Sequence, residues 1–133
     1  MRRLITALLC LLALTALAAC GSNGGDQPGT IVGDVFIDCD QDGECDCEEM
    51  GFADVSIQIF HDDCGGVPMQ TIDTDDEGNF EFTGLEPGPY CVMSNLKPNC
   101  GGHFPTTTIT REVTLEAGQM LQLESFGYTE MGQ

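Results

Sequence analysis

Beyond residue 30, hydrophobic and polar residues alternate along most of the chain. Val55, Ile57 and Ile59 are separated by Ser56 and Gln58, a spacing that buries one face of a β-strand and exposes the other. Clusters of Gly, Pro, Asp and Asn separate such runs, and these residues favour turns. No part of this region has the period of an amphipathic helix.

Short segments of this kind predict the strands of a single domain. They lie at residues 31–37, 55–59, 69–73, 80–82, 90–96, 111–115 and 120–126. Short strands with frequent turns are typical of an antiparallel β-sandwich. We therefore predict an all-β sandwich of about seven strands over residues 30–127, followed by a short tail at 128–133.

The first residues have a different character. Arg2 and Arg3 precede an uncharged apolar run at residues 4–19, which is shorter than the roughly 20 apolar residues of a membrane-spanning helix. This arrangement predicts a signal peptide at residues 1–19. The polar, Gly-rich stretch at 20–29 predicts a flexible linker.

The end of the apolar run reads Leu17-Ala18-Ala19-Cys20-Gly21, which resembles a bacterial lipobox. The resemblance implies cleavage before Cys20 and a lipid on its thiol, so that the domain is anchored in a cell-envelope membrane, at the outer membrane or the cell surface. The alternative is an ordinary secretory signal that is cut after Ala19 and leaves Cys20 as a spare thiol.

Charge narrows the range of partners. The chain carries a formal charge of −18, and beyond Cys20 only Lys97 and Arg111 oppose 22 acidic residues. Such a surface repels phosphate backbones, so we expect no nucleic-acid binding. It attracts cations. Disorder, the other reading of high charge, fits poorly with the alternating apolar runs.

The most specific motif is the acidic loop, which we define as residues 38–49. Acidic residues occupy positions one, three, five, nine and twelve of this segment, and Gly43 occupies position six. This is the spacing of an EF-hand calcium loop, in which position seven contributes its backbone carbonyl. The predicted Ca²⁺ ligands are Asp38, Asp40, Asp42, Glu44 (through its carbonyl), Asp46 and Glu49. The alternative is a solvated acidic turn. Because the flanking segments resemble strands, we expect the loop to lie on a sheet, without the helices of an EF-hand.

The acidic loop also belongs to a longer pattern. The run 35–51 around it, together with segments 55–59, 74–82 and 85–92, resembles the B-type domain of serine-aspartate-repeat surface adhesins. The resemblance implies a transthyretin-like sandwich, related to the B-type domains of collagen adhesins, that binds Ca²⁺ and acts as a rigid spacer or adhesive module. It carries over the same ligand set, and Asp73 and Asp75 are weaker candidates because a tight turn explains Asp75 equally well.

Six cysteines follow the predicted lipid anchor: Cys39, Cys45, Cys47, Cys64, Cys91 and Cys100. An even number in an exported domain predicts three disulfides, with fifteen possible pairings. A zinc site is the first alternative, but His61 and His103 are isolated and we expect both at the surface. A redox pair at Cys45 and Cys47 is the second, although the surrounding carboxylates would raise the pKa of these thiols.

The sequence contains no recognisable nucleophile–base pair and no phosphate-binding glycine loop. We therefore predict a non-enzymatic, membrane-anchored surface lipoprotein whose calcium-stabilised sandwich is structural or adhesive. One alternative is an accessory or receptor lipoprotein that binds an extracellular protein, peptide or carbohydrate, with residues 99–105 as an exposed loop. The other is a thiol-disulfide oxidoreductase using Cys45 and Cys47.

Overall fold

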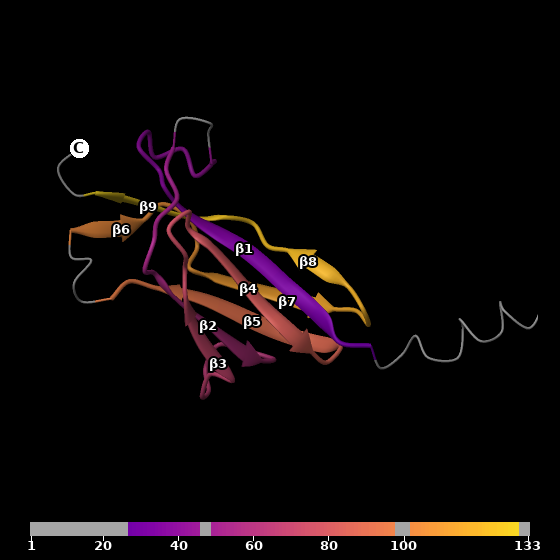
Figure 1. The fold of residues 1–133 in the computed structure, drawn as a ribbon. Helices are drawn as coiled ribbons and strands as arrows, with labels where there is room; N and C mark the ends of the chain where they lie inside the picture. The colour runs from indigo at the N-terminus through magenta and orange to yellow at the C-terminus, as the bar shows by residue number, and fades with distance from the viewer. Residues whose placement is uncertain (1–26, 46–48, 98–101, 131–133) are drawn as a thin grey trace, which may run out of the picture.

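The computed structural model describes residues 27–45, 49–97 and 102–130. Within these ranges the chain forms nine strands in two sheets that pack face to face (Figure 1). The strands are β1 (Gly29–Ile37), β2 (Ser56–His61), β3 (Gln70–Asp73), β4 (Asn79–Leu85), β5 (Gly88–Asn95), β6 (His103–Pro105), β7 (Thr110–Leu115), β8 (Met120–Gln122) and β9 (Phe126–Glu130). The predicted all-β sandwich is confirmed.

The two sheets differ in the direction of their strands. One has the order β3-β2-β5-β7 and is antiparallel throughout. The other has the order β4-β1-β9-β6, and β8 also pairs with β1. Here β1 runs parallel to both β8 and β9, a pairing that the sequence did not predict. After β7 the chain crosses from the opposite sheet back to the sheet that contains β1. Strands β8 and β9 therefore enter that sheet through a crossover connection, which permits parallel pairing with β1.

The carboxyl-terminal part of the domain differs from the prediction in three places. The segment 120–126, predicted as one strand, is divided between β8 and β9, and Leu123 between them is buried. Strand β9 continues through Glu130, so Tyr128, assigned to a tail, is a core residue. Strand β6 lies where an exposed loop was expected and pairs with β9 at the edge of its sheet, where a proline is tolerated.

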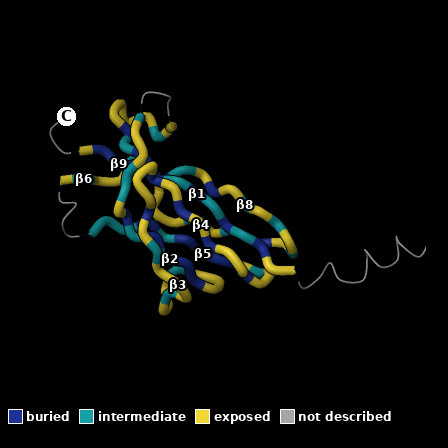
Figure 2. The backbone as a smooth tube through the Cα atoms, viewed as in Figure 1, coloured by how far each residue is buried: buried dark blue, intermediate teal, exposed yellow. Residues whose placement is uncertain are grey.

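The core lies between the sheets, where the central strands contain buried residues (Figure 2). Ile31 and Val35 of β1 belong to the same core cluster as Ile57 and Ile59 of β2, and all four are fully buried. The polar ends of core side chains are hydrogen-bonded. The Tyr128 hydroxyl and Ser94 Oγ, for example, lie 2.6 Å apart and are buried. The alternation seen in the sequence therefore corresponds to burial.

One disulfide, Cys64–Cys91, fastens the β2–β3 connection to β5. Cys91 lies opposite Phe60 in the β2–β5 register, and both are buried. Cys39 carries a free, exposed thiol whose Sγ lies 3.9 Å from the Ile37 carbonyl oxygen, so the expectation that all six cysteines pair is wrong for this residue. Cys47 and Cys100 lie outside the described residues.

The predicted signal peptide and lipidated Cys20 also lie outside the described residues. In the ranges that the structure covers, no helix has the length and apolar character needed to cross a membrane.

Candidate metal centre

The acidic loop leaves the end of β1 and returns beside it. The Ile37 N–H donates to the Met50 carbonyl at 2.8 Å, which closes the base of the loop. Two glycines allow the chain segments at this base to lie close together. A Cβ on Gly51 would lie 1.8 Å from the Glu77 carbonyl oxygen, and Gly78 adopts a φ of +82°, which favours glycine. The loop is therefore held by the sheet, without flanking helices, as its strand-like surroundings predicted.

Three of the predicted ligands meet in the first half of the loop. Carboxylate oxygens of Asp38, Asp40 and Asp42 all lie within 4.8 Å of one another. The loop winds around them through its own hydrogen bonds. Asp40 accepts the Asp42 N–H at 3.2 Å, and Asp42 accepts the Glu44 N–H at 2.8 Å. Alternate side chains consequently point to one side, as they must to converge on an ion.

Asp38 is the best-fixed member of this group. Its side chain is completely buried, its N–H donates to the Tyr128 carbonyl at 2.7 Å, and Oδ2 accepts the Gly43 N–H at 2.9 Å. Its other oxygen, Oδ1, is also buried. The Thr106 hydroxyl lies beside the carboxylate and acts on it as a hydrogen-bond donor.

The pKa values of two carboxyls reflect their crowding. Burial acts to raise the pKa of Asp38, but the Thr106 side chain and the backbone N–H of Gly43 lower it, and the net shift is downward. For Asp40 the Asp42 N–H lowers the pKa, whereas desolvation and the negative charge of Asp42 raise it, and the net shift is upward. A cation between the carboxyls would relieve the repulsion that raises the pKa of Asp40.

The remaining predicted ligands are less gathered. Glu49 Oε1 accepts the Cys39 N–H at 2.9 Å, which ties the last residue of the acidic loop to its second, and Glu49 is not part of the aspartate trio. Glu44 is exposed. Asp46 lies in the part of the loop that the structure does not describe. The hard-oxygen donors that are in place fit Ca²⁺, which accepts six to eight oxygens in irregular geometry.

The two weaker candidates take no part in this group. Asp73 forms an ion pair with Lys97 at 2.7 Å. Asp75 Oδ1 accepts the N–H groups of Glu77 and Asn79, each at 2.9 Å. The side chain of Asp75 is therefore used to stabilise a tight turn, which is the alternative that the sequence left open.

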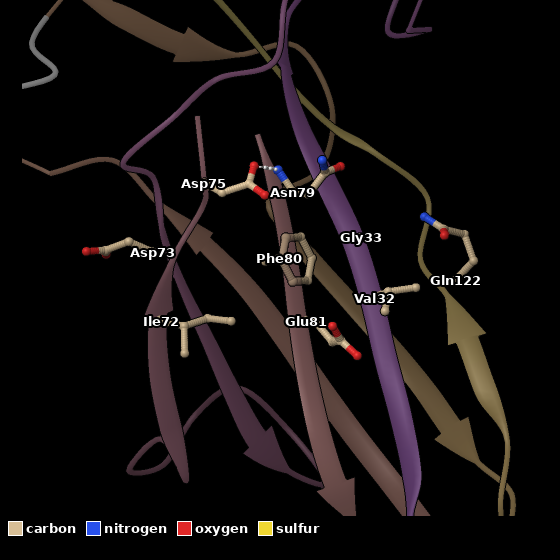
Figure 3. Close-up of a pocket in the computed structure, with 9 residues that line it drawn as sticks. All are labelled: Val32, Gly33, Ile72, Asp73, Asp75, Asn79, Phe80, Glu81 and Gln122. Carbon is tan, nitrogen blue, oxygen red and sulfur yellow. Dashed lines mark hydrogen bonds between the residues drawn. The ribbon is translucent and has the colours of Figure 1, made fainter. Parts of the chain in front are cut away.

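Asp73 and Asp75 instead line a separate cleft of about 470 Å³ between β3 and β4 (Figure 3). Phe80 lies at its centre, between Ile72 and Gly33, but only 5% of this residue is exposed. The cleft therefore presents little aromatic surface for stacking against a sugar ring.

The histidines behave differently from one another. His61 is exposed, as expected, and stacks on Tyr90 with ring centroids 5.2 Å apart. His103, expected at the surface, is half-buried against Phe52, with ring centroids 4.7 Å apart. Its place in β6 explains the difference, because that strand was not predicted.

Known proteins resemble this chain in sequence and in fold. The model of the SdrD B-like domain family matches residues 30–117. The chain belongs to the SdrD B-like domain family. Serine-aspartate repeat-containing protein C of Staphylococcus aureus strain N315 is 32% identical over 109 residues, which cover 81% of this chain but 10% of that protein. The same protein of strain Newman is 34% identical over 84 residues, covering 62% of this chain and 8% of the relative.

Solved structures with a similar fold include GBS52, the minor pilin of Streptococcus agalactiae. It matches with a TM-score of 0.60 and 14% identity, over 81% of this chain and 47% of the pilin. The Bacillus anthracis TIE protein matches with a TM-score of 0.55 and 16% identity, over 78% of this chain and 18% of that protein. At this level of identity the likeness concerns the fold. It supports the β-sandwich and its strand arrangement.

The SdrD B-like domain here spans about a tenth of the length of the staphylococcal relatives it matches. The family match includes the complete acidic loop but ends before β8 and β9. Tyr128, whose carbonyl accepts the Asp38 N–H, lies beyond it. The residues that hold the base of the loop therefore come partly from outside the matched region.

Proposed function

We propose that this SdrD B-like domain is a calcium-stabilised, non-enzymatic module of the cell surface with a structural or adhesive role, tethered to a membrane by a lipid on Cys20. Family membership supports a surface module, because the matched relatives are serine-aspartate repeat proteins and the pilin GBS52 shares the fold. The lipid anchor rests on the lipobox-like segment alone.

The observation that carries the calcium site is the buried Asp38 carboxylate. A charged group removed from water requires compensation by an opposite charge or by hydrogen bonds. Asp38 receives the Gly43 N–H and lies beside the Thr106 hydroxyl, but it has no positive charge opposite it among the described residues, while Asp40 and Asp42 add further negative charge nearby. A divalent cation bound by the three carboxylates supplies the compensating charge.

The test is calcium titration of the full chain, purified in oxidised form and freed of metal with a chelator. We expect heat and uptake in calorimetry and a rise in melting temperature with calcium. Extracellular sites bind at about 10⁻⁴–10⁻³ M, and a ligand at about 100 times its Kd adds about 2.7 kcal/mol to the free energy of unfolding.

Two variants separate binding from a general effect of charge. Asp38→Asn removes the buried charge and should abolish the response to calcium. Asp76→Asn removes one negative charge from an exposed position and should retain it. A wild-type domain whose melting temperature ignores calcium, or an Asp38→Asn variant that responds normally, would refute the calcium site.

The alternatives have less support. The cleft between β3 and β4 offers little aromatic surface for a carbohydrate, and Asp73 on its rim is already paired with Lys97. For an oxidoreductase using Cys45 and Cys47, titration of free thiols in the native chain is the direct test. A reactive pair would appear as thiols that interconvert with a disulfide under mild redox poise.

A further inference from the structure

The cleft between β3 and β4 is bordered by two strand edges that have no partner strand among the described residues (Figure 3). Strand β3 ends the sheet order β3-β2-β5-β7, and β4 ends the order β4-β1-β9-β6. An edge strand presents backbone N–H and C=O groups to whatever lies beside it. The register of each strand shows which of its residues do so here.

On β4, the backbone of Glu81 points away from the rest of the sheet. The Val35 N–H donates to the Gly78 carbonyl at 2.8 Å, and three positions further along the same register Glu81 lies opposite Val32. Opposite residues in an antiparallel pair alternate between exchanging hydrogen bonds and facing away, so Val32 and Glu81 face away from each other. The Val32 carbonyl accordingly accepts the Leu123 N–H on the other side of β1. The N–H and C=O of Glu81 are thus directed at the open edge.

On β3, the same reasoning applies to Asp73. The Thr74 N–H donates to the Val55 carbonyl at 2.9 Å, and Asp73 lies opposite Ser56 at the next position of that register. The backbone of Asp73 therefore points away from β2. Asp73 and Glu81 both line the cleft, so outward backbone groups of the two sheets lie along the same cavity.

The side chains around the cleft show what kind of segment fits these edges. Ile72, which packs against the core, and the ring of Phe80 form an apolar floor. The rim carries carboxylates, and none of the described residues that line the cleft is basic. Lys97 pairs with Asp73, but Glu81 has no ion pair among the described residues. The charge at the open edge of β4 is therefore negative and uncompensated.

We propose that this cleft binds an extended segment of a partner protein, with lysine or arginine at every second position, which adds as a strand beside β4. Strand addition gives affinity through main-chain hydrogen bonds and specificity through alternate side chains. One set of side chains of the segment packs on Ile72 and Phe80, and the other lies beside the Glu81 carboxylate. A second copy of this chain fits poorly, because it carries the same excess of acidic residues. The inference rests on the adhesive form of the proposed function and does not require the calcium site.

The probe is a fluorescently labelled eight-residue peptide of alternating lysine and valine, and anisotropy at low salt measures its binding to the full chain. A block peptide, with the lysines first and the valines after them, has the same charge without the alternation. We expect the alternating peptide to bind about 10-fold more tightly, because only its side chains match the pairs that an added strand forms. Bound peptide should also slow hydrogen exchange of the Glu81 amide, measured by NMR. Equal binding of the two peptides would overturn strand addition.

Glu81→Pro removes the outward N–H and places a proline ring at the open edge, a position where proline breaks no hydrogen bond to the neighbouring strand. Binding should fall about 10-fold. Glu112→Pro in β7 is the matched control, because Glu112 is exposed and lies at the opposite edge of the sheet that contains β3. The Ser94 N–H donates to the Ile109 carbonyl at 2.9 Å, and in that register the backbone of Glu112 also points outward. This control should bind the peptide as wild type does.

Glu81→Lys keeps the N–H and reverses the charge, so it decides the question even if the proline variant fails to fold. It should bind the alternating peptide about fivefold more weakly, whereas Glu112→Lys, which has the same net charge, should lose less. Equal effects at the two positions would overturn the site. A dimer in light scattering without peptide, disrupted by Glu81→Lys, would assign the edge to a second copy and overturn the basic partner. If calcium raises the melting temperature but the alternating peptide does not bind, this surface is refuted and the calcium-stabilised module stands.

Discussion

Removal of the Cys64–Cys91 disulfide should cost a large part of the stability of this domain. The bridge joins cysteines that are 27 positions apart in the sequence. In the chain-entropy description, opening a loop of that length lowers the free energy of unfolding by about 3.5 kcal/mol at 25 °C. Natural domains are commonly stable by only about 5–15 kcal/mol. The variant should therefore stay folded with a much reduced margin.

Cys64→Ala is the appropriate change. Cys64 is half-buried, whereas Cys91 is 1% exposed and its replacement would also leave a cavity. Urea denaturation of the oxidised full chain, in chelator so that calcium plays no part, measures the free energy directly. At about 4 °C for each kcal/mol in a domain of this size, the melting temperature should fall by about 14 °C.

Cys39→Ala is the matched control, because Cys39 is exposed and carries a free thiol. Its replacement should leave the free energy of unfolding within about 0.5 kcal/mol of wild type. The reasoning is refuted if Cys64→Ala costs less than about 1 kcal/mol, which would be far below the entropic estimate. An equal loss in Cys39→Ala would show that the stabilising bridge involves the acidic loop.

Three other changes test the packing. Gly33→Ala should lower the free energy of unfolding by about 1–3 kcal/mol in urea, because its Cβ would lie 2.4 Å from a ring atom of the buried Phe80. Tyr128→Phe should cost about 1–3 kcal/mol by leaving the buried Ser94 hydroxyl without its partner. Burial raises the pKa of Tyr128, although the Ser94 hydrogen bond opposes this. The stabilisation that comes from the neutral, buried Tyr128 hydroxyl should therefore be complete below about pH 10, the pKa of an unfolded tyrosine. It should be lost as the pH rises through the higher pKa of the folded state. Tyr128→Phe, which has no hydroxyl to ionise, should lose less stability over that range of pH. A chain that ends at residue 117 should fail to fold by circular dichroism, because it lacks β8, β9 and three core side chains; a cooperative melt would contradict this.

Much of the fold could be predicted because its determinants are local. The alternation at residues 55–59 reflects a strand with one buried face, and β2 matches it within two residues at either end. The acidic loop was found by spacing alone, since its turn depends on residues that are close in sequence. Asp38, Asp40 and Asp42 do come together.

What the sequence did not predict depends on contacts between distant segments. The parallel pairing of β1 with β8 and β9 leaves no periodic signal, since either direction buries alternate residues. Strand β6 has three residues and ends in a proline, so it resembles a loop. Thr106 stands in a run of three threonines, a pattern with no specific chemistry. Only the folded domain brings its hydroxyl beside the Asp38 carboxylate.

The position of β1 has a consequence for the order in which the domain assembles. On one side β1 pairs with β4, and on the other it pairs with β8 and β9, the last strands of the chain. Contacts between such distant segments carry a loop-closure cost, and they slow folding. One edge of β1 is therefore completed only by β8 and β9, which come last in the described domain. The Asp38–Tyr128 hydrogen bond at the base of the acidic loop also needs β9 in place, so we expect the proposed calcium site to stabilise the finished domain and to contribute little to its early folding.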